Sequence, residues 1–303
     1  MDKMHYNKSL SSPWYDLDLT VTPLISNTKI TVHAAHTAWS YEDNAKNGPN
    51  NWHVSYPDCQ GPMQSPIDIN TSKVLLDPSL QEFNLSEYFI TDGVDTKLEN
   101  VGGHTAEVTF SGRSLYLSGG SLPARYKLEQ LHFHWGQNDT HGSEHTINNH
   151  SSPMELHVVH RQERFSSVGA AAPSPFGLAV LSFLFKIGRH NANYSQLIDY
   201  LQSIPNPDDD VELPDLHLAD LIPHQFDYYR YHGSLTTPPC YESVFWSISL
   251  QHIEISALQL AQFRSLYKEG HQKLLNDFRP IQPLNHRTVF GSRRQRSFWN
   301  FPG

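Results

Sequence analysis

Three histidines in two short windows are the residues whose spacing could do chemistry. His132 and His134 stand two positions apart in a window at 129–136, and His157 stands in a second window at 154–160. Because successive side chains of a strand alternate between two faces, His132 and His134 share one face if the first window is a strand. A neighbouring strand carrying His157 on the same face adds a third imidazole. Three imidazoles on one rigid sheet face fit a catalytic zinc site whose fourth position is open to water.

The neighbours of these histidines matter, because a chain with 19 histidines can hold such a pair by chance. A metal-bound histidine usually donates its second ring N–H to a carboxylate or an amide. Gln130 and Glu155 each lie two positions from a proposed ligand and would share its face. We therefore expect the three histidines to bind zinc, with Gln130 and Glu155 as their hydrogen-bond partners. Four nearby histidines lack such support and are predicted to be packing or surface residues: His141, His145, His150 and His160.

Short alternating or apolar runs, separated by Gly, Pro, Asn and Asp, indicate a protein rich in strands. The predicted strands span 106–110, 114–117, 130–135, 155–161, 178–185 and 244–250. One helix is predicted at 194–201, where apolar residues recur at helical spacing. A second is predicted to start at Ser256, with Gln259 completing a capping box, and to continue through Tyr267. The pattern predicts a sheet-dominated α+β fold.

Composition is that of an ordinary globular protein, with 38% hydrophobic and 17% charged residues. We expect one domain at 39–291, because no linker or repeat interrupts it, with an N-terminal extension at 1–38 and a C-terminal tail at 292–303. The net charge of −9 and the lack of a basic stripe argue against nucleic-acid binding. No apolar run approaches the ~20 residues that span a bilayer.

Several longer motifs resemble the α-carbonic anhydrases and occur in the order expected of that family, between about 39 and 290. They are Gln-Ser-Pro-Ile-Asp-Ile at 64–69, Gln-Leu-His-Phe-His-Trp-Gly at 130–136, Gly-Ser-Glu-His-Thr at 142–146, Glu-Leu-His-Val-Val at 155–159, Gly-Leu-Ala-Val at 177–180 and Gly-Ser-Leu-Thr-Thr-Pro-Pro at 233–239. The resemblance implies one large, twisted, mostly antiparallel sheet with short peripheral helices and zinc at the base of a conical cleft. It also implies reversible hydration of carbon dioxide to bicarbonate and a proton, by attack of zinc-bound hydroxide.

The resemblance assigns roles to further residues. Thr236 would orient the zinc hydroxide by accepting a hydrogen bond from it and donating one to Glu144, because an ionised carboxylate can only accept. His104 would carry the proton out, since histidine titrates near neutrality. Gly102 and Glu107 stand where the fastest members carry hydrophilic amide residues, which leaves the speed of proton transfer open. The implied substrate contacts are Thr236, Thr237, Val159, Val180, Leu235, Val244 and Trp246, with Tyr41 in the water network.

Cellular location is indicated by the two cysteines, Cys59 and Cys240. Extracellular members of the resembled family carry a disulfide at these places, and disulfides persist in oxidising compartments. Six glycosylation sequons point the same way, at Asn7, Asn70, Asn84, Asn138, Asn149 and Asn193. Neither a signal peptide at the start nor a hydrophobic anchor at the end is visible. We expect a glycoprotein of the secretory pathway or extracellular space, with the cytoplasm as the alternative.

Two other functional classes compete with a carbon dioxide hydratase. A carbonic-anhydrase-like binding or adhesion module typically lacks one or more of the zinc-binding histidines, whereas this chain keeps all three. A zinc hydrolase acting on esters or peptides is disfavoured, because neither H-E-x-x-H nor G-x-S-x-G occurs. The partners expected by resemblance are carbon dioxide and bicarbonate, with sulfonamides and anions as inhibitors.

Overall fold

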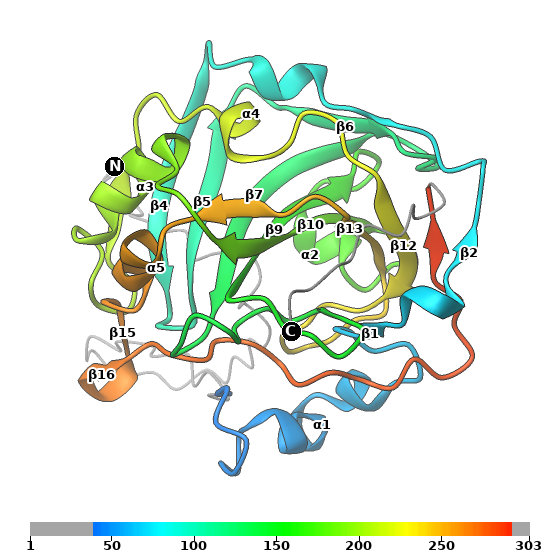
Figure 1. Ribbon diagram of the computed structural model, residues 1–303, viewed down its shortest axis with the longest axis horizontal. Helices are drawn as coiled ribbons and strands as arrows, with labels where there is room; N and C mark the ends of the chain where they lie inside the picture. The colour runs from blue at the N-terminus through cyan, green and yellow to red at the C-terminus, as the bar shows by residue number, and fades with distance from the viewer. Residues whose placement is uncertain (1–38, 293–303) are drawn as a thin grey trace, which may run out of the picture.

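A 13-stranded mixed sheet runs through residues 39–292, the part of the chain that the computed structural model describes (Figure 1). Its main strands, in the order in which they lie side by side, are β11 (Asp210–Glu212), β4 (Val94–Val101), β5 (Thr105–Gly112), β7 (Tyr126–Trp135), β9 (Met154–Gln162), β10 (Leu178–Ile187), β13 (Val244–Ser249), β12 (Tyr228–Gly233), β17 (Phe290–Gly291) and β2 (Leu75–Leu76). Most neighbours are antiparallel, and β10 and β13 are parallel. The predicted sheet-dominated α+β domain is confirmed. The predicted extension at 1–38 and the tail beyond Ser292 lie outside the described residues.

The remaining strands are short. Strands β3 (Phe83–Asn84), β6 (Tyr116–Gly119) and β14 (Ile253–Ile255) also belong to this sheet, whereas β1 (Asp68–Ile69) with β8 (Thr146–Ile147) and β15 (Tyr267–Lys268) with β16 (Gln272–Lys273) form two separate two-stranded sheets. The α-helices are α1 (Trp52–Ser55), α2 (Val168–Ala171), α3 (Ser195–Leu201), α4 (Leu218–Leu221) and α5 (Ala257–Phe263), and the 3-10 helices are η1 (Pro49–Asn51), η2 (Pro57–Gln60), η3 (Thr71–Lys73), η4 (Ser86–Phe89), η5 (Ala192–Tyr194) and η6 (Glu269–His271). Within residues 39–292, every helix is too short or too polar to cross a membrane.

Two-residue periodicity places the core and the histidines on opposite faces of β7. Leu131, Phe133 and Trp135 are fully buried in the larger hydrophobic cluster. Phe263 of α5 packs against two of these rings, with centroids 5.0 Å from Phe133 and 5.4 Å from Trp135. Helices α3 and α5 lie together along this part of the molecule (Figure 1). The alternation thus turns the histidines toward the other side of the sheet.

The predicted strands at 106–110, 130–135, 155–161, 178–185 and 244–250 correspond to β5, β7, β9, β10 and β13, each within about two residues except β7, which starts four residues earlier. The run predicted at 114–117 overlaps β6 only in its second half. Gly112 adopts a positive φ of 71°, and the Arg113 N–H is bound by the Gly93 carbonyl, so the chain is still turning at 114. Strands β4 and β12 were not predicted.

The second predicted helix begins at the expected residue but ends earlier than predicted. Ser256 and Gln259 form the capping box at the start of α5. Tyr267, predicted to be helical, instead lies in β15, so that part of the prediction is wrong. The Tyr267 N–H donates to the Pro205 carbonyl, and Tyr267 pairs with Lys273 of β16. These longer-range bonds outweigh the helical spacing of its side chain.

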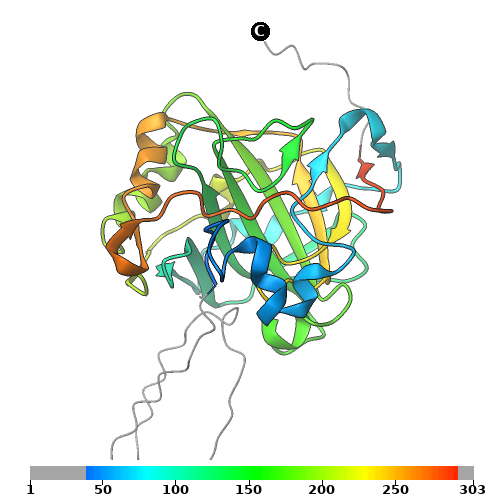
Figure 2. The same ribbon diagram turned by 90° about the horizontal axis from the view of Figure 1, so that it is seen from below.

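A disulfide between Cys59 and Cys240 ties η2 to the loop before β13, across 181 residues. Arg279 reinforces the same junction, because its guanidinium donates to the Cys59 carbonyl at 3.0 Å and to Gln64 Oε1 at 2.9 Å. Figure 2 shows α1 and η2 together on the underside of the sheet. The loop between β12 and β13 is therefore held to the amino-terminal part of the domain, which matters because this loop carries Thr236 and Thr237, two predicted site residues.

We predict that replacing Cys59 and Cys240 with serine lowers the free energy of unfolding by about 2–5 kcal/mol, because the unfolded chain regains the entropy of a long open loop. Urea denaturation with and without reductant measures the change. Wild-type protein in reductant should match the double variant in buffer. Equal stability of the oxidised wild type and the variant would show that the disulfide does not stabilise the fold.

Candidate metal centre

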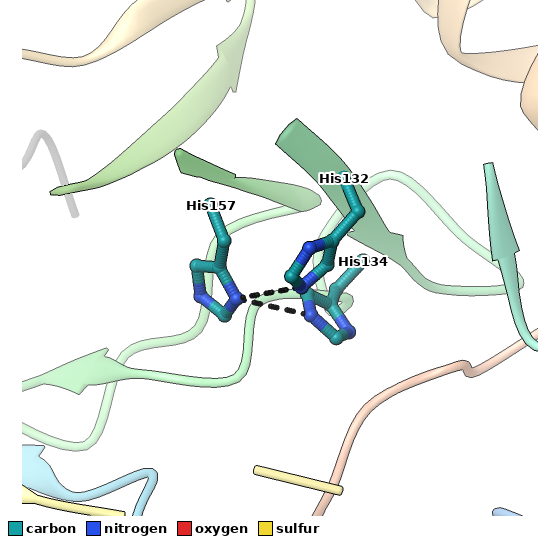
Figure 3. Close-up of side chains that lie close together, drawn as sticks. All are labelled: His132, His134 and His157. Atoms are coloured by element: carbon teal, nitrogen blue, oxygen red, sulfur yellow. Dashed lines mark hydrogen bonds between the residues drawn. The ribbon is translucent and has the colours of Figure 1, made fainter. Parts of the chain in front are cut away.

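Three histidine side chains converge where β7 and β9 lie side by side. His132 stands directly opposite His157 in the antiparallel ladder, and His134 follows one pleat later. His157 Nδ1 lies 3.2 Å from His132 Nε2 and 3.1 Å from His134 Nε2. Figure 3 shows the three rings turned toward one common point. The structure thus brings together the three histidines predicted as ligands.

The second nitrogen of each ring is held by a group that accepts a hydrogen bond. His134 Nδ1 donates to the Asp277 carbonyl at 2.7 Å, and a carbonyl can only accept. His157 Nε2 donates to Glu155 Oε1 at 2.7 Å. His132 Nδ1 donates to Gln130 Oε1, also at 2.7 Å. Each neutral ring therefore turns its unprotonated nitrogen toward the other two.

The close contacts drawn in Figure 3 consequently join nitrogens that both carry lone pairs. Converging lone pairs repel one another, and a cation placed between them turns that repulsion into coordination. A tetrahedral ion with metal–nitrogen bonds of about 2.0–2.1 Å sets its ligands about 3.3 Å apart. The contacts at 3.1 and 3.2 Å agree with this spacing. The three histidines form a group that could hold a metal ion.

Burial keeps these rings neutral. It lowers the pKa of His134 to about 4 and also lowers the pKa of His132 and His157 below the ordinary value. At neutral pH all three imidazoles are unprotonated at the facing nitrogen and ready to coordinate. A site of this kind loses its ligands to protons as the solution becomes acidic, so we expect metal binding to weaken at low pH.

Glu155 is the end of a buried network behind His157. Burial opposes its ionisation, yet His145 and His157 hold the pKa of Glu155 well below its usual range. Its Oε1 accepts from His145 Nδ1 and from Ser182 Oγ, at 2.7 and 2.6 Å. His145 in turn accepts from the Tyr231 hydroxyl at 2.7 Å. This arrangement fixes the carboxylate that orients His157.

His145 is a supporting residue that the sequence did not identify as such. It was predicted to be a packing or surface residue, and it is fully buried with both ring nitrogens bound. Although His145, Glu155 and His157 lie close enough to hold an ion, their facing atoms are already joined by N–H donors. Asp277 was missed as well, because it acts through a backbone carbonyl, which every residue has.

Glu144 lies beside the convergence point. Its Oε2 is 3.5 Å from His134 Nε2 and 4.0 Å from His157 Nδ1, and its Oε1 accepts from the Arg279 N–H at 2.9 Å. Burial raises the pKa of Glu144 to about 7, against the opposing effects of His157, the Arg279 backbone and the Thr236 hydroxyl. A cation held by the histidines would favour the ionised carboxylate.

The histidines form the floor of a cavity with two unlike sides. Its apolar wall consists of Val159, Val180, Leu235 and Trp246. Its polar wall consists of Tyr41, Thr105, Glu107, Gln130, Thr236 and Thr237. Val244, also predicted to contact substrate, is buried in the hydrophobic cluster behind the apolar wall.

His104 lies near the cavity, against an aromatic group. Its ring stacks on Trp39 with centroids 4.0 Å apart and planes inclined by 13°, and it meets the Tyr41 ring edge at 6.2 Å. Burial, together with the nearby charge of Lys268, lowers the pKa of His104 to about 4. In this orientation the imidazole is neutral at pH 7.

Comparison with known proteins identifies the family. The family model of the eukaryotic-type carbonic anhydrases matches residues 47–293 of this chain. Carbonic anhydrase 1 of Monodelphis domestica is 40% identical over 265 residues, which cover 85% of this chain and 99% of that protein. Carbonic anhydrase 3 of Sus scrofa is 38% identical over 261 residues, covering 84% and 98%. The chain belongs to the eukaryotic-type carbonic anhydrase family and is an enzyme of that family.

We predict that His104 titrates with a pKa of about 4 in the metal-free protein, because the Trp39 ring shields it from water. Trp39→Ala should raise this pKa toward the usual 6.5 by exposing the imidazole. Proton NMR of the histidine ring, followed from pH 3.5 to 8 by roughly half-unit steps, measures both values. A wild-type pKa near 6.5 that Trp39→Ala leaves unchanged would contradict the stacked orientation.

Proposed function

We propose that this chain catalyses the reversible hydration of carbon dioxide to bicarbonate and a proton, at a zinc ion held by His132, His134 and His157. One observation carries the proposal: three imidazole lone pairs converge at the floor of a cavity that is apolar on one side and polar on the other. Membership of the carbonic anhydrase family and the names of the relatives support it.

The donor set favours zinc. Neutral imidazole suits zinc among the divalent metals, and three histidines with an open fourth position are typical of a catalytic zinc site. Bound zinc would supply a positive charge that lowers the pKa of a water molecule to about 7, an effect for which carbonic anhydrase is itself the standard example.

Thr236 and Glu144 give the reacting oxygen a direction. An ionised Glu144 can only accept, so the Thr236 hydroxyl donates to it and keeps its own lone pairs for the reacting water. The attacking lone pair of that water is thereby turned toward the cavity. Thr236 is 6% exposed, so bulk water competes little for its hydroxyl.

The apolar wall suits the substrate. Carbon dioxide carries no hydrogen-bond donor, and Val159, Val180 and Trp246 offer it dispersion contacts beside the polar floor. Bicarbonate is charged and favours water over such a wall, which promotes its release. Thr237 borders the same space and is proposed to contact bound substrate or product. We also expect sulfonamides and small anions to inhibit by occupying this site, as the resemblance implies.

Proton release is proposed to use His104 in a solvated orientation, with Tyr41 in the water network. The centroids of the two rings lie 6.2 Å apart, and Tyr41 lines the cavity. We expect this step to be the slow part of the cycle in weak buffer, because an efficient proton carrier has a pKa near the working pH. Small imidazole-like buffers should bypass it.

We predict that purified protein contains about one zinc per chain and accelerates carbon dioxide hydration, and that His134→Ala abolishes both. Elemental analysis and stopped-flow hydration assays measure the two quantities. Thr236→Ala should keep the zinc and lower kcat/KM by roughly 100-fold, because the reacting oxygen loses its orientation.

Thr237→Ala is the matched control for Thr236→Ala, since it removes a neighbouring hydroxyl from the same wall and should have a much smaller effect. A zinc-loaded wild type without hydratase activity would refute the proposed reaction. Equal losses in the two threonine variants would refute the orienting role of Thr236.

We further propose that the chain is a glycoprotein of the secretory pathway. The Cys59–Cys240 disulfide supports an oxidising compartment. Five sequons lie within the described residues, and all five asparagines are exposed: Asn70, Asn84, Asn138, Asn149 and Asn193. Asn193 is the least suitable, because its side-chain N–H donates to the Asp220 carbonyl at 2.8 Å.

We predict that protein from its natural source has no thiol reactive before reduction and loses mass on enzymatic deglycosylation. Peptide mapping should place glycans at Asn70, Asn84, Asn138 or Asn149 before Asn193. Two free thiols and an unchanged mass would instead favour the cytoplasmic alternative.

A further inference from the structure

Glu107 is a buried carboxylate in the cavity wall that the proposed reaction does not use. It lies on β5, is 2% exposed and stands directly opposite His132 of β7 in the ladder. Its Oε2 accepts a hydrogen bond from Gln130 Nε2 at 2.8 Å. The same Gln130 side chain accepts from His132 Nδ1 through Oε1. A continuous path of hydrogen bonds thus joins Glu107 to a metal ligand.

The partner of His132 differs in kind from the partners of the other two ligands. His134 donates to a backbone carbonyl and His157 to a carboxylate, and both groups present only acceptors. Gln130 is an amide, which presents an acceptor at one end and two donors at the other. Rotation by half a turn would offer N–H groups to His132 Nδ1 and favour the tautomer that carries its proton at Nε2.

We propose that Glu107 is a positioning residue for the metal site, which holds Gln130 in the one orientation that leaves the lone pair of His132 Nε2 free for the metal. By binding Nε2 of the amide, the carboxylate directs Oε1 toward His132. The inference rests on the proposed zinc site and adds a residue to it.

A neighbouring carboxylate provides a matched control. Glu99 of β4 stands opposite Glu107 on the same rung of the sheet and is also buried, at 7% exposed. Its carboxylate pairs with Lys97 Nζ at 3.0 Å, and it does not line the cavity. Loss of a buried carboxylate near β5 can therefore be separated from loss of the contact to Gln130.

The test is a double-mutant cycle on zinc affinity, measured by competition with a chromophoric chelator at pH 7.5. Glu107→Ala should weaken zinc binding by roughly tenfold, the lower end of what outer hydrogen-bond partners contribute. In the Gln130→Ala background the same change should have almost no effect, because Glu107 then has nothing to orient. Glu99→Ala should leave the dissociation constant of zinc unchanged.

An unchanged dissociation constant in Glu107→Ala, or an equal loss in both backgrounds, would overturn the inference. If Glu107→Ala does not fold, Glu107→Gln conserves the shape and can replace it in the same cycle. The smaller loss of zinc affinity expected for Glu107→Gln must likewise disappear in the Gln130→Ala background. Because the measured quantity is zinc affinity, a chain that binds zinc but does not hydrate carbon dioxide refutes the proposed reaction and leaves this test intact.

Discussion

The convergence of three imidazole lone pairs on one point is the constraint on which the rest of the site depends. Each lone pair is directed by an acceptor on the far side of its ring: a backbone carbonyl for His134, a carboxylate for His157 and an oriented amide for His132. Sheet register sets the distances, because His132 and His157 are direct cross-strand partners. A slip of one residue would turn every histidine of that strand into the hydrophobic core on the opposite face.

The remaining parts of the site come from loops, and the fold fixes those loops by bonds remote in sequence. Arg279 is central: its backbone N–H binds Glu144, and its guanidinium binds the Cys59 carbonyl and Gln64. The disulfide secures the turn that follows Thr237. Glu144 and the turn after Thr237 are thereby connected to the same scaffold as the three histidines. A rigid sheet carries the histidines that could hold a metal ion, while cross-linked loops carry the pair that we propose to direct the reacting oxygen.

Sequence reasoning succeeded where local pattern and chemistry agree. The H-x-H spacing in an alternating run predicted both β7 and a shared face for two ligands, and the capping box located the start of α5. It failed where distant contacts decide. Tyr267 fits a helical spacing, but its backbone N–H donates to the Pro205 carbonyl. Asp277 accepts a hydrogen bond from His134 through its backbone carbonyl, a group that every residue has and that the sequence therefore cannot single out. The stacking of His104 on Trp39 is likewise a distant contact, because Trp39 is 65 positions earlier in the chain. The roles predicted for Thr236, Glu144 and Val244 came from the family resemblance, since their own spacing carries no such signal, and Val244 is not among the residues that line the cavity.

The most direct test of the account is anomalous X-ray diffraction from zinc-loaded crystals, recorded on both sides of the zinc absorption edge. The account predicts a single strong peak within bonding distance of His132 Nε2, His134 Nε2 and His157 Nδ1, at about 2.0–2.1 Å from each. A peak bound through other nitrogens, or no peak at these three histidines in protein shown to contain zinc, would contradict it.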